Sequence, residues 1–560
     1  MSSTEQFSDP LLEIRNLSID FQTPEGSQRA VNGLNLSLQP GEVMGLVGES
    51  GSGKSITAKS IMRLLPGNAL LASNSQIRLH TGQTWVDVMG LHGRDLRLVR
   101  GGQVSMIFQE PMASFAPAIR VGDQIVETIR LHTGADRQSA RRQGIELFDR
   151  VGIREPEKRF DQYVFELSGG MRQRAMIAMA LATRPRLLIA DEPTTALDVT
   201  VQAQVLELML ELREQFGMAM LFITHDLGVI SRIADNITVM QKGDLVESGS
   251  CDRVLFAPTQ DYTKRLLDAL PHLDSLPAAP ADKAPPLVTV RDLSIVYPPS
   301  APGQPAFKAV PRMNLELPAG QIIGLVGESG SGKTSLGKAL LGAAPISSGE
   351  VCYRFETPLR LAAGARVKRK ALARVAQLVF QDPYSALNPR MTVRDIIAEP
   401  LLALGLCRNN DEVNQRVVEV AKRCQIEVSH LRRFPHAFSG GQRQRISIAR
   451  ALVVQPRFIV ADEAVAALDV SIQAEILALL KSLRDEMGLT ILFISHDLSV
   501  VANLCDHVCV MQQGRLVEQG SVREIFLHPQ EPYTRALINA IPTLQHPAER
   551  QQGEGISCRA

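Results

Sequence analysis

Residues 45–54 read GLVGESGSGK, and residues 324–333 repeat the same letters. Ser55 follows the first stretch and Thr334 the second, so each completes the pattern Gly-x-x-x-x-Gly-Lys-Ser/Thr. In this pattern the glycines permit positive φ angles, and backbone N–H groups close around phosphate oxygens. The lysine can reach the β and γ phosphates, and the hydroxyl can bind Mg²⁺. Each copy therefore predicts the phosphate-binding loop of a nucleoside triphosphatase.

The sequence around the two loops supports this prediction. Apolar residues 43–47 are typical of a buried strand, and the residues after Lys54 predict a helix whose N-terminus faces the anion. A single glycine- and serine-rich turn can match the pattern by chance, but two identical copies with matching downstream motifs exclude that explanation. The residues predicted to surround the nucleotide are Gly48, Glu49, Ser50, Gly51, Ser52, Gly53, Lys54 and Ser55 in the first copy, and Gly327, Glu328, Ser329, Gly330, Ser331, Gly332, Lys333 and Thr334 in the second.

The composition of the 560 residues excludes several classes of protein. Lys and Arg total 60 against 59 for Asp and Glu, which argues against a strongly electrostatic partner such as bulk nucleic acid. A hydrophobic content of 45% is enough to build the cores of several domains. No apolar run approaches the length of a transmembrane helix, and the polar N-terminal residues are not typical of a signal peptide.

The seven cysteines are scattered along the chain. Cys505 and Cys509 lie close together in an apolar context, and no second pair lies near them in sequence. That spacing favours a position in the core over a metal site. Scattered thiols of this kind fit the reducing conditions of the cytosol.

The internal repeat predicts the domain organisation. We expect a first domain at residues 10–270, a second at residues 287–545 and a C-terminal tail at residues 546–560. Residues 271–286 read PHLDSLPAAPADKAPP between the two domains. This Pro- and Ala-rich composition is typical of a semi-rigid, solvated linker.

Each copy opens with β-type runs that end in an aromatic residue, Phe21 in the first and Tyr297 in the second. Such a residue can stack on adenine, or it can pack in the core at the end of a strand. Position alone leaves these interpretations even, and the recurrence in both copies favours stacking.

A glutamine follows an apolar strand-like run in both copies. Residues 106–111 read MIFQEP and residues 378–383 read LVFQDP. Gln109 and Gln381 can ligate Mg²⁺ or orient water, and they can also sense a partner through the segment that follows.

A Ser-Gly-Gly run recurs as LSGGMRQR at residues 167–174 and FSGGQRQR at residues 438–445. It precedes a helical pattern in each copy and predicts a second anion-binding helix start, although such a turn is also a common way to begin any helix. The candidate residues are Ser168, Gly169, Gly170, Ser439, Gly440 and Gly441.

Two adjacent carboxylates end another apolar run, LLIADE in the first copy and FIVADE in the second. We expect Asp191 and Asp462 to hold the Mg²⁺ shell. Alternation along the strand would direct Glu192 and Glu463 to the other side, where each can polarise the attacking water.

A histidine follows each acidic pair at the same spacing, His225 in a Thr-His-Asp run and His496 in a Ser-His-Asp run. This fixed register favours contact with the γ-phosphate over a purely structural role. Between glutamate and histidine, Ala-Leu-Asp segments end at Asp198 and Asp469.

This ordered set of motifs resembles the ATP-binding cassette (ABC) ATPases, and the resemblance covers nearly the whole chain, twice. It implies an α/β fold of tandem P-loop NTPase domains. Each domain would have a RecA-like core, an antiparallel β subdomain and an α-helical signature subdomain. ATP and Mg²⁺ are the implied cofactors, and ATP hydrolysis coupled to transport is the implied activity.

In the family that the sequence resembles, two cassettes enclose two ATP molecules, and each site borrows the Ser-Gly-Gly signature of the other cassette. The first phosphate loop would thus act with residues 439–441, and the second with residues 168–170. The implied catalytic residues are Glu192, His225, Glu463 and His496. The implied metal ligands are Ser55, Gln109, Asp191, Thr334, Gln381 and Asp462.

A narrower resemblance comes from the end of each copy. Residues 257–267 read APTQDYTKRLL and residues 528–537 read HPQEPYTRAL, similar to the extension of oligopeptide, dipeptide and nickel import ATPases. The fused form resembles the ATPase subunits of microcin C/peptide and glutathione importers. Some relatives carry a C-terminal cysteine cluster for an iron–sulfur centre, but only Cys558 lies near this end, so none is predicted.

The partners implied by this resemblance are two integral-membrane permease subunits and a solute-binding protein, with no nucleic acid. The chain would lie peripherally on the cytoplasmic face of the bacterial inner membrane. The alternative is a soluble twin-cassette protein acting on ribosomes or DNA, but such proteins carry a long, charged linker. Export is a third possibility that the extensions disfavour. The solute stays open among peptide, glutathione, microcin-like peptide, opine and nickel.

The two copies differ near the predicted sites. The differing pairs are Pro193 and Ala464, Thr194 and Val465, Met171 and Gln442, and Ala116 and Asn388. Loss of the proline frees φ just beyond the second glutamate. Because the directly catalytic side chains occur in both copies, we hypothesise two hydrolysis-competent but unequal sites, with the second slower.

Overall fold

The computed structural model describes residues 9–23, 26–109, 111–194, 199–268, 276, 284–299, 305–365, 369–466 and 468–541. The chain divides into two compact units, the first built mainly from residues up to Leu270 and the second mainly from Pro271–Ile541. Most of the predicted linker, the predicted tail, the Ala-Leu-Asp segment that ends at Asp198, Ala467 and Cys558 lie outside the described residues.

The centre of the first unit, within its described residues, is a six-stranded sheet in the order β11-β10-β3-β9-β8-β7. Its strands are β3 (Val43–Val47), β7 (Val104–Ile107), β8 (Leu187–Asp191), β9 (Ala219–Thr224), β10 (Asn236–Gln241) and β11 (Asp244–Ser250). All neighbours pair in parallel except β10 and β11. The middle strands are continuous apolar runs because both faces of the sheet are covered.

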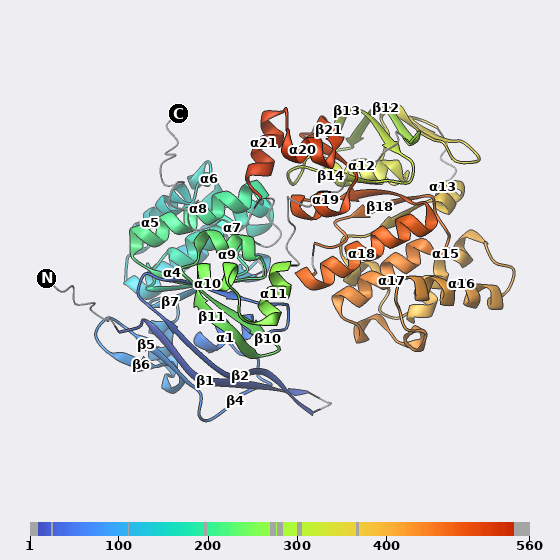
Figure 1. The fold of residues 1–560 in the computed structure, drawn as a ribbon. Coiled ribbons are helices and arrows are strands. Elements are labelled where there is room, and N and C mark those ends of the chain that lie inside the picture. The colour runs from blue at the N-terminus through green and yellow to red at the C-terminus, as the bar shows by residue number, and fades with distance from the viewer. Residues whose placement is uncertain are drawn as a thin grey trace. The chain divides into compact units, whose positions relative to one another are not determined.

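One face of this sheet packs on an antiparallel sheet, drawn in blue in Figure 1. Its described strands follow the order β2-β1-β5-β6, with β4 also paired to β1. They are β1 (Leu12–Thr23), β2 (Gly26–Leu38), β4 (Ala69–Leu71), β5 (Gln76–His80) and β6 (Trp85–Asp87). The helix α1 (Lys54–Ile61) packs within the apolar core between the two sheets.

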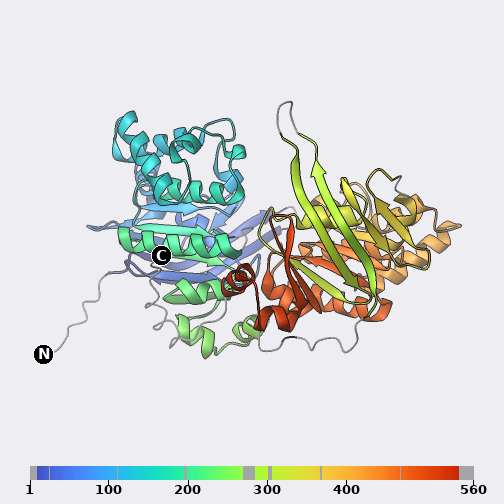
Figure 2. The ribbon, with the colours of Figure 1, turned by 90° about the horizontal axis from the view of Figure 1, so that it is seen from above.

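Helices cover the other face and form a second apolar core with it. The cyan and teal helices form a lobe beside the sheet in Figure 2. The helices of the unit besides α1 are α2 (Gly93–Val99), α3 (Pro111–Ser114), α4 (Val121–Thr133), α5 (Arg137–Arg150), α6 (Pro156–Phe160), α7 (Gly169–Leu181), α8 (Val199–Phe216), α9 (Leu227–Ile233), α10 (Cys251–Phe256) and α11 (Asp261–Asp268). Short 3₁₀ turns lie at Val88–Gly90 and Val164–Glu166.

The second unit repeats this arrangement. Its described core sheet has the order β17-β18-β19-β14-β20-β21, and its described antiparallel sheet the order β13-β12-β15-β16. The strands are β12 (Pro286–Tyr297), β13 (Phe307–Pro318), β14 (Ile322–Val326), β15 (Ser348–Tyr353), β16 (Leu359–Ala362), β17 (Ala376–Val379), β18 (Phe458–Asp462), β19 (Thr490–Ile494), β20 (His507–Gln512) and β21 (Arg515–Ser521).

The helices of the second unit again cover one face of its core sheet. They are α12 (Lys333–Leu340), α13 (Arg369–Val375), α14 (Pro383–Ala386), α15 (Val393–Leu404), α16 (Asn410–Arg423), α17 (Gly440–Leu452), α18 (Val470–Met487), α19 (Leu498–Leu504), α20 (Val522–Leu527) and α21 (Pro532–Asn539). Short 3₁₀ turns lie at Val428–Arg432 and Pro435–Ala437. The predicted combination of a parallel core, an antiparallel sheet and a helical signature layer is therefore confirmed in both units.

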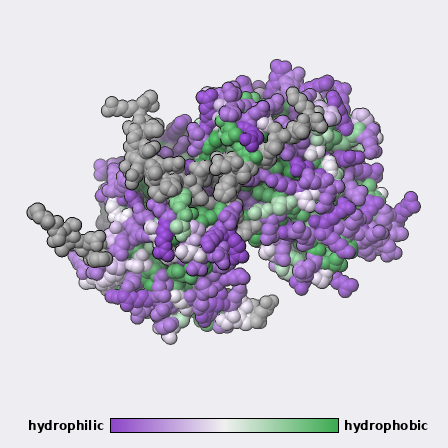
Figure 3. Space-filling view, viewed as in Figure 1, coloured by the Kyte–Doolittle hydropathy of each residue, from purple (hydrophilic) through white to green (hydrophobic). Residues whose placement is uncertain are grey.

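The surface and the cysteines also agree with the sequence. Hydrophilic residues cover most of the described surface that Figure 3 displays. Among the described helices, none is both long and apolar enough to cross a membrane. Cys505 and Cys509 are buried in apolar clusters, as predicted, and no group of metal-ligating side chains occurs in the described part of the chain.

Candidate nucleotide site

The phosphate loop connects the carboxyl end of β3 to the start of α1, as the apolar run and the following helical pattern predict. Gly48 has a φ of 147°, and a Cβ atom there would lie 2.1 Å from the carbonyl oxygen of Met240. In the second unit Gly327 has a φ of 145°, and a Cβ atom would lie 2.0 Å from the carbonyl oxygen of Met511. Only glycine fits at this entry to the loop, because both the backbone angle and the space exclude a side chain.

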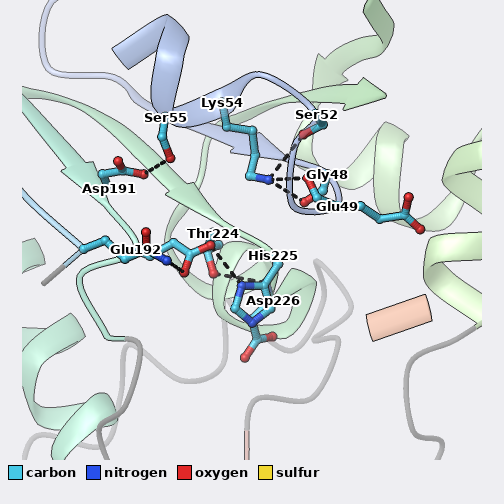
Figure 4. Close-up of polar contacts among 11 residues, drawn as sticks. Gly48, Glu49, Ser52, Lys54, Ser55, Asp191, Glu192, Thr224, His225 and Asp226 are labelled. Atoms are coloured by element: carbon cyan, nitrogen blue, oxygen red, sulfur yellow. Dashed lines mark hydrogen bonds and ion pairs between the residues drawn. The ribbon is translucent and has the colours of Figure 1, made fainter. Parts of the chain in front are cut away.

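The loop lysine lies inside the loop that it belongs to (Figure 4). Lys54 Nζ donates to the carbonyl oxygens of Gly48 at 2.7 Å and Glu49 at 2.8 Å, and to Ser52 Oγ at 3.3 Å. Lys333 makes the matching contacts in the second unit at 2.7, 2.8 and 3.4 Å. These bonds hold a buried ammonium group where the motif needs a cation for phosphate oxygens.

The hydroxyl that ends each loop binds the first carboxylate of the acidic pair. Ser55 Oγ donates to Asp191 Oδ1 at 2.9 Å, and Thr334 Oγ1 donates to Asp462 Oδ1 at 3.1 Å. Asp191 is only 2% exposed, and burial raises the pKa of both aspartates despite these hydrogen bonds. A buried carboxylate of this kind gains from a nearby cation.

The second carboxylate of the pair turns away from the strand for a reason that alternation did not predict. Glu192 and Glu463 have left-handed backbones, with φ values of 48° and 47°. The strands end at the preceding aspartates, and the Glu192 N–H donates to the carbonyl oxygen of Ile223 at 2.9 Å. Strand alternation therefore does not set the direction of these glutamates. Since φ is the same in both copies, the proline that follows only Glu192 does not set it either.

Both glutamates bind the predicted glutamine and histidine, and Figure 4 shows Glu192 beside His225 in the first unit. Gln109 Nε2 donates to Glu192 Oε2 at 2.8 Å, and His225 Nδ1 lies 3.2 Å from Glu192 Oε1. In the second unit the corresponding distances at Glu463 are 2.6 Å and 3.3 Å. In each unit, the glutamine and the histidine thus come from separate segments, and both contact the carboxylate of the glutamate. Each glutamine directs its amide nitrogen at the glutamate, so its role as a metal ligand stays a prediction.

The histidine and the glutamate change each other's protonation. Burial disfavours the imidazolium of His225, but the hydrogen bond and charge of Glu192 outweigh it and raise the pKa of His225. The pKa of His496 is raised for the same reason. Burial would raise the pKa of Glu463, yet the hydrogen bond from His496 lowers it, so Glu463 is held ionised.

The aromatic residues lie at the ends of the first strands of each unit, as predicted. Phe21 lies half-buried on β1, and Tyr297 is the last residue of β12. The Tyr297 hydroxyl donates to Ser335 Oγ at 3.3 Å, within the first turn of the helix that follows the phosphate loop. Adenine stacking by these residues stays a prediction.

The Ser-Gly-Gly runs start α7 and α17, so each helix begins at its first glycine. Ser168 Oγ accepts from the Met171 N–H, and Ser439 Oγ accepts from the Gln442 N–H, both at 3.4 Å. The Gln442 side chain also accepts from the Ser439 N–H at 3.1 Å, which completes a capping box that methionine cannot form.

Two sets of contacts near the site were not predicted. Tyr262 and Tyr533, from the extensions, lie within hydrogen-bond distance of the phosphate loops. The Tyr-Thr pairs of the extensions were recognised in the sequence, but they were interpreted as a mark of the subfamily and not as a contact to the phosphate loop. Gln173 Nε2 donates to the Pro193 carbonyl oxygen, whereas the buried amide of Gln444 finds no partner among the described residues.

The comparisons with known proteins agree with this geometry. The sequence model of the ABC transporter family matches residues 31–195 and 310–466. The model described as oligopeptide/dipeptide transporter, C-terminal region, matches residues 517–559. The paired phosphate loops, acidic pairs and histidines define a P-loop ATPase with two cassettes. The chain belongs to the ABC transporter family and is one of its ATP-hydrolysing proteins.

Similar curated proteins align along nearly the whole chain. The peptidoglycan transport ATP-binding protein YejF of Agrobacterium fabrum strain C58 is 46% identical over 96% of this chain and 97% of its own length. The glutathione import ATP-binding proteins GsiA of Pectobacterium atrosepticum and Escherichia coli K12 are 42% and 41% identical. The two alignments cover 97% and 98% of this chain, and 91% and 92% of the respective GsiA protein. The predicted transport function is thus confirmed over action on ribosomes or DNA.

Solved structures match single cassettes. CbiO1 of Clostridium perfringens, part of the ABC transporter complex cbiONQ, is 28% identical with a TM-score of 0.40. It covers 48% of this chain and 99% of that protein. A dimeric cassette bound to ADP and phosphate is 26% identical with a TM-score of 0.38, covering 42% of this chain and 99% of its own.

Proposed function

We propose that the chain is the ATP-hydrolysing subunit of an importer for peptides or related small solutes. The observation that carries this proposal is the presence, in both units, of a complete set of loop lysine, acidic pair, glutamine and histidine. The match to the oligopeptide/dipeptide transporter C-terminal region supports the solute class. The names of the relatives, which concern peptidoglycan and glutathione transport, support the same class.

At each site, the chemistry is the attack of water on the γ-phosphorus of ATP, with loss of ADP. Glu192 or Glu463 would polarise the water and take its proton. The paired histidine would hold the glutamate in place and then contact the γ-phosphate. Lys54 or Lys333 would neutralise the phosphate oxygens that gain charge as the bond to ADP breaks.

The residues around each loop hydroxyl suit Mg²⁺. Ser55 and Asp191 offer oxygen atoms at hydrogen-bond distance from each other, and Thr334 and Asp462 do the same in the second unit. Oxygen donors of this type are the ligands that Mg²⁺ prefers. When bound there with ATP, the ion would offset the charge of the β and γ phosphates. The amide oxygen of Gln109 or Gln381, which takes no part in the bond to glutamate, would complete this set.

Each ATP site would be shared between the two units. The first phosphate loop would bind ATP with residues 439–441, and the second with residues 168–170, so that ATP joins the units and hydrolysis releases them. Carrying both units in one chain raises the effective concentration of each for the other. This cycle would drive rearrangement of two membrane permease subunits, to which the chain would bind peripherally at the cytoplasmic face. A separate solute-binding protein would deliver the solute.

The two sites would be unequal. Pro193 accepts a hydrogen bond from Gln173 directly after the first catalytic glutamate. The second unit has Ala464 there, and Gln444 has no partner among the described residues. A buried amide without a partner costs free energy and leaves the backbone after Glu463 less constrained. This difference supports a slower second site.

Uptake by a deletion strain tests the proposed function. The strain would be supplied with the wild-type chain or with Lys54→Ala Lys333→Ala, and uptake of labelled dipeptide and glutathione would be measured. We expect uptake of at least one solute with the wild type and none with the variant. Co-purification provides the second measurement. Recovery of ribosomal RNA instead of multi-span membrane proteins would contradict the proposal.

A further inference from the structure

The extension that ends each cassette reaches back to the phosphate loop of the same unit. The Glu49 N–H donates to the Tyr262 hydroxyl oxygen at 3.3 Å, and the Glu328 N–H donates to the Tyr533 hydroxyl oxygen at 3.1 Å. The tyrosines lie in the first turns of α11 and α21. The contact therefore joins segments that are more than two hundred residues apart, and it occurs twice.

The loop residue in this contact is fixed on both of its backbone polar groups. While the Glu49 N–H meets Tyr262, the Glu49 carbonyl oxygen accepts from Lys54 Nζ at 2.8 Å and from the Ser52 N–H at 3.1 Å. The Glu328 carbonyl oxygen accepts from Lys333 and Ser331 in the same way. A shift of the backbone at Glu49 or Glu328 would thus move the lysine of the same loop, Lys54 or Lys333.

The tyrosine is itself held in place by a carboxylate of the core sheet. Glu247 on β11, which is 4% exposed, accepts from the Thr259 N–H at 2.9 Å, the Thr259 hydroxyl at 2.8 Å and the Gln260 N–H at 3.3 Å. These donors lie just before α11. Burial opposes the charge of Glu247, but the hydrogen bonds that it accepts hold its pKa at about 2.

The second unit repeats this anchor. Glu518 on β21 accepts from the Gln530 N–H at 2.8 Å and the Glu531 N–H at 3.2 Å, just before α21. Despite burial, these bonds lower the pKa of Glu518. A charged carboxylate, a turn, a short helix and a tyrosine thus link the last strand of each core sheet to the phosphate loop.

We propose that Tyr262 and Tyr533 are positioning residues that hold the phosphate loops in the conformation that binds ATP. Each acts through the Glu49 or Glu328 peptide, and the extension thereby becomes part of the ATP site of its own unit. This inference rests on the proposed function in one respect, namely that the loops bind ATP. Anything that displaces α11 or α21 would weaken ATP binding in that unit.

The test replaces the hydroxyl and keeps the ring, with Tyr262→Phe, Tyr533→Phe and the double variant. We expect the KM for ATP of the double variant to rise about three- to tenfold, the range for loss of one hydrogen bond, with kcat changed less than about twofold. The matched control is Tyr353→Phe, which removes another buried tyrosine hydroxyl, bonded to the Leu340 carbonyl at the far end of α12. That control should lower the melting temperature and leave the KM unchanged.

Hydrogen exchange localises the effect. Peptides covering residues 45–54 and 324–333 differ in mass through their flanking residues, so the loops can be followed separately. Tyr262→Phe should speed exchange only in the first loop, and Tyr533→Phe only in the second.

The proposal is overturned if the Phe variants keep the wild-type KM and loop exchange, or if they lose only melting temperature as the control does. Binding of a fluorescent ATP analogue separates this failure from that of the proposed function. If Lys54→Ala Lys333→Ala binds the analogue as the wild type does, the loops are not the ATP sites. If it does not bind and the Phe variants bind normally, only the role of the tyrosines is lost.

Discussion

At the scale of single residues, the glutamate of each acidic pair contacts both the glutamine and the histidine of its site. Glu192 binds Gln109 on one carboxylate oxygen and His225 on the other. Its carboxylate therefore lies between a neutral donor and a histidine with a raised pKa. A base in this arrangement needs little rearrangement before it accepts a proton from water.

The first prediction concerns the inequality of the two glutamates. Glu192→Gln should reduce the steady-state ATPase rate more than Glu463→Gln. The reason is that Gln173 bonds to Pro193 in the first unit, whereas Gln444 of the second has no partner among the described residues. Loss of a catalytic base lowers a rate by about 10²- to 10⁴-fold at the affected site. The measurement is phosphate release by each single variant and by the double variant. Equal losses in the two single variants would refute the inequality.

Much of the site at this scale follows from sequence. The Lys54 side chain lies inside its loop, and the Ser55 hydroxyl that ends the loop binds Asp191, as the motifs indicate. The direction of Glu192 did not follow, because strand alternation assumes extended backbone and the residue is left-handed. The tyrosine contact did not follow either, since a motif does not reveal which backbone N–H a distant hydroxyl will meet.

At the scale of elements, the turn before the extension helix is bonded to a buried carboxylate of the core sheet. Glu247 faces donors that all lie in the turn before α11. Its neighbours on β11 are ordinary strand residues, and the sequence of this strand gives no sign of an anchor. The strands and helices themselves were predictable, as β3 at Val43–Val47 and the helix after Lys54 demonstrate.

The second prediction is a pH dependence of this anchor. The folded pKa of Glu247, about 2, lies below its ordinary value of 4.5. A carboxylate whose pKa is depressed stabilises the fold above the unfolded pKa, and that stabilisation is lost as pH falls through the folded pKa. The difference between 4.5 and about 2 corresponds to roughly 3 kcal/mol in unfolding free energy.

Glu247→Gln should therefore be less stable than the wild type by up to this amount from pH 5 to 8. The gap should narrow as pH falls from about 4.5 toward 2. Chemical unfolding of both proteins across this pH series measures the gap, and Glu518→Gln should change in the same direction. A gap that stays constant below pH 4.5 would show that the charge of Glu247 does not hold the extension.

At the scale of the whole molecule, the chain is one fold used twice. The two core sheets have the same strand order, and the glutamine and histidine contacts of one glutamate carboxylate recur at the other. The internal repeat made this visible in sequence. The proposed sharing of ATP between the two units rests on the family resemblance rather than on any motif of one copy.

The proposed sharing of ATP sites can be tested by combining substitutions within and across the copies. Lys54→Ala Ser439→Arg changes both parts of one proposed site. Lys54→Ala Ser168→Arg instead changes one part of each of the two proposed sites. The ATPase rate per chain is compared with that of Lys54→Ala alone. We expect Lys54→Ala Ser439→Arg to keep the ATPase rate of this parent and Lys54→Ala Ser168→Arg to lose it. The reverse pattern would show that each unit completes its own site and would contradict shared sites.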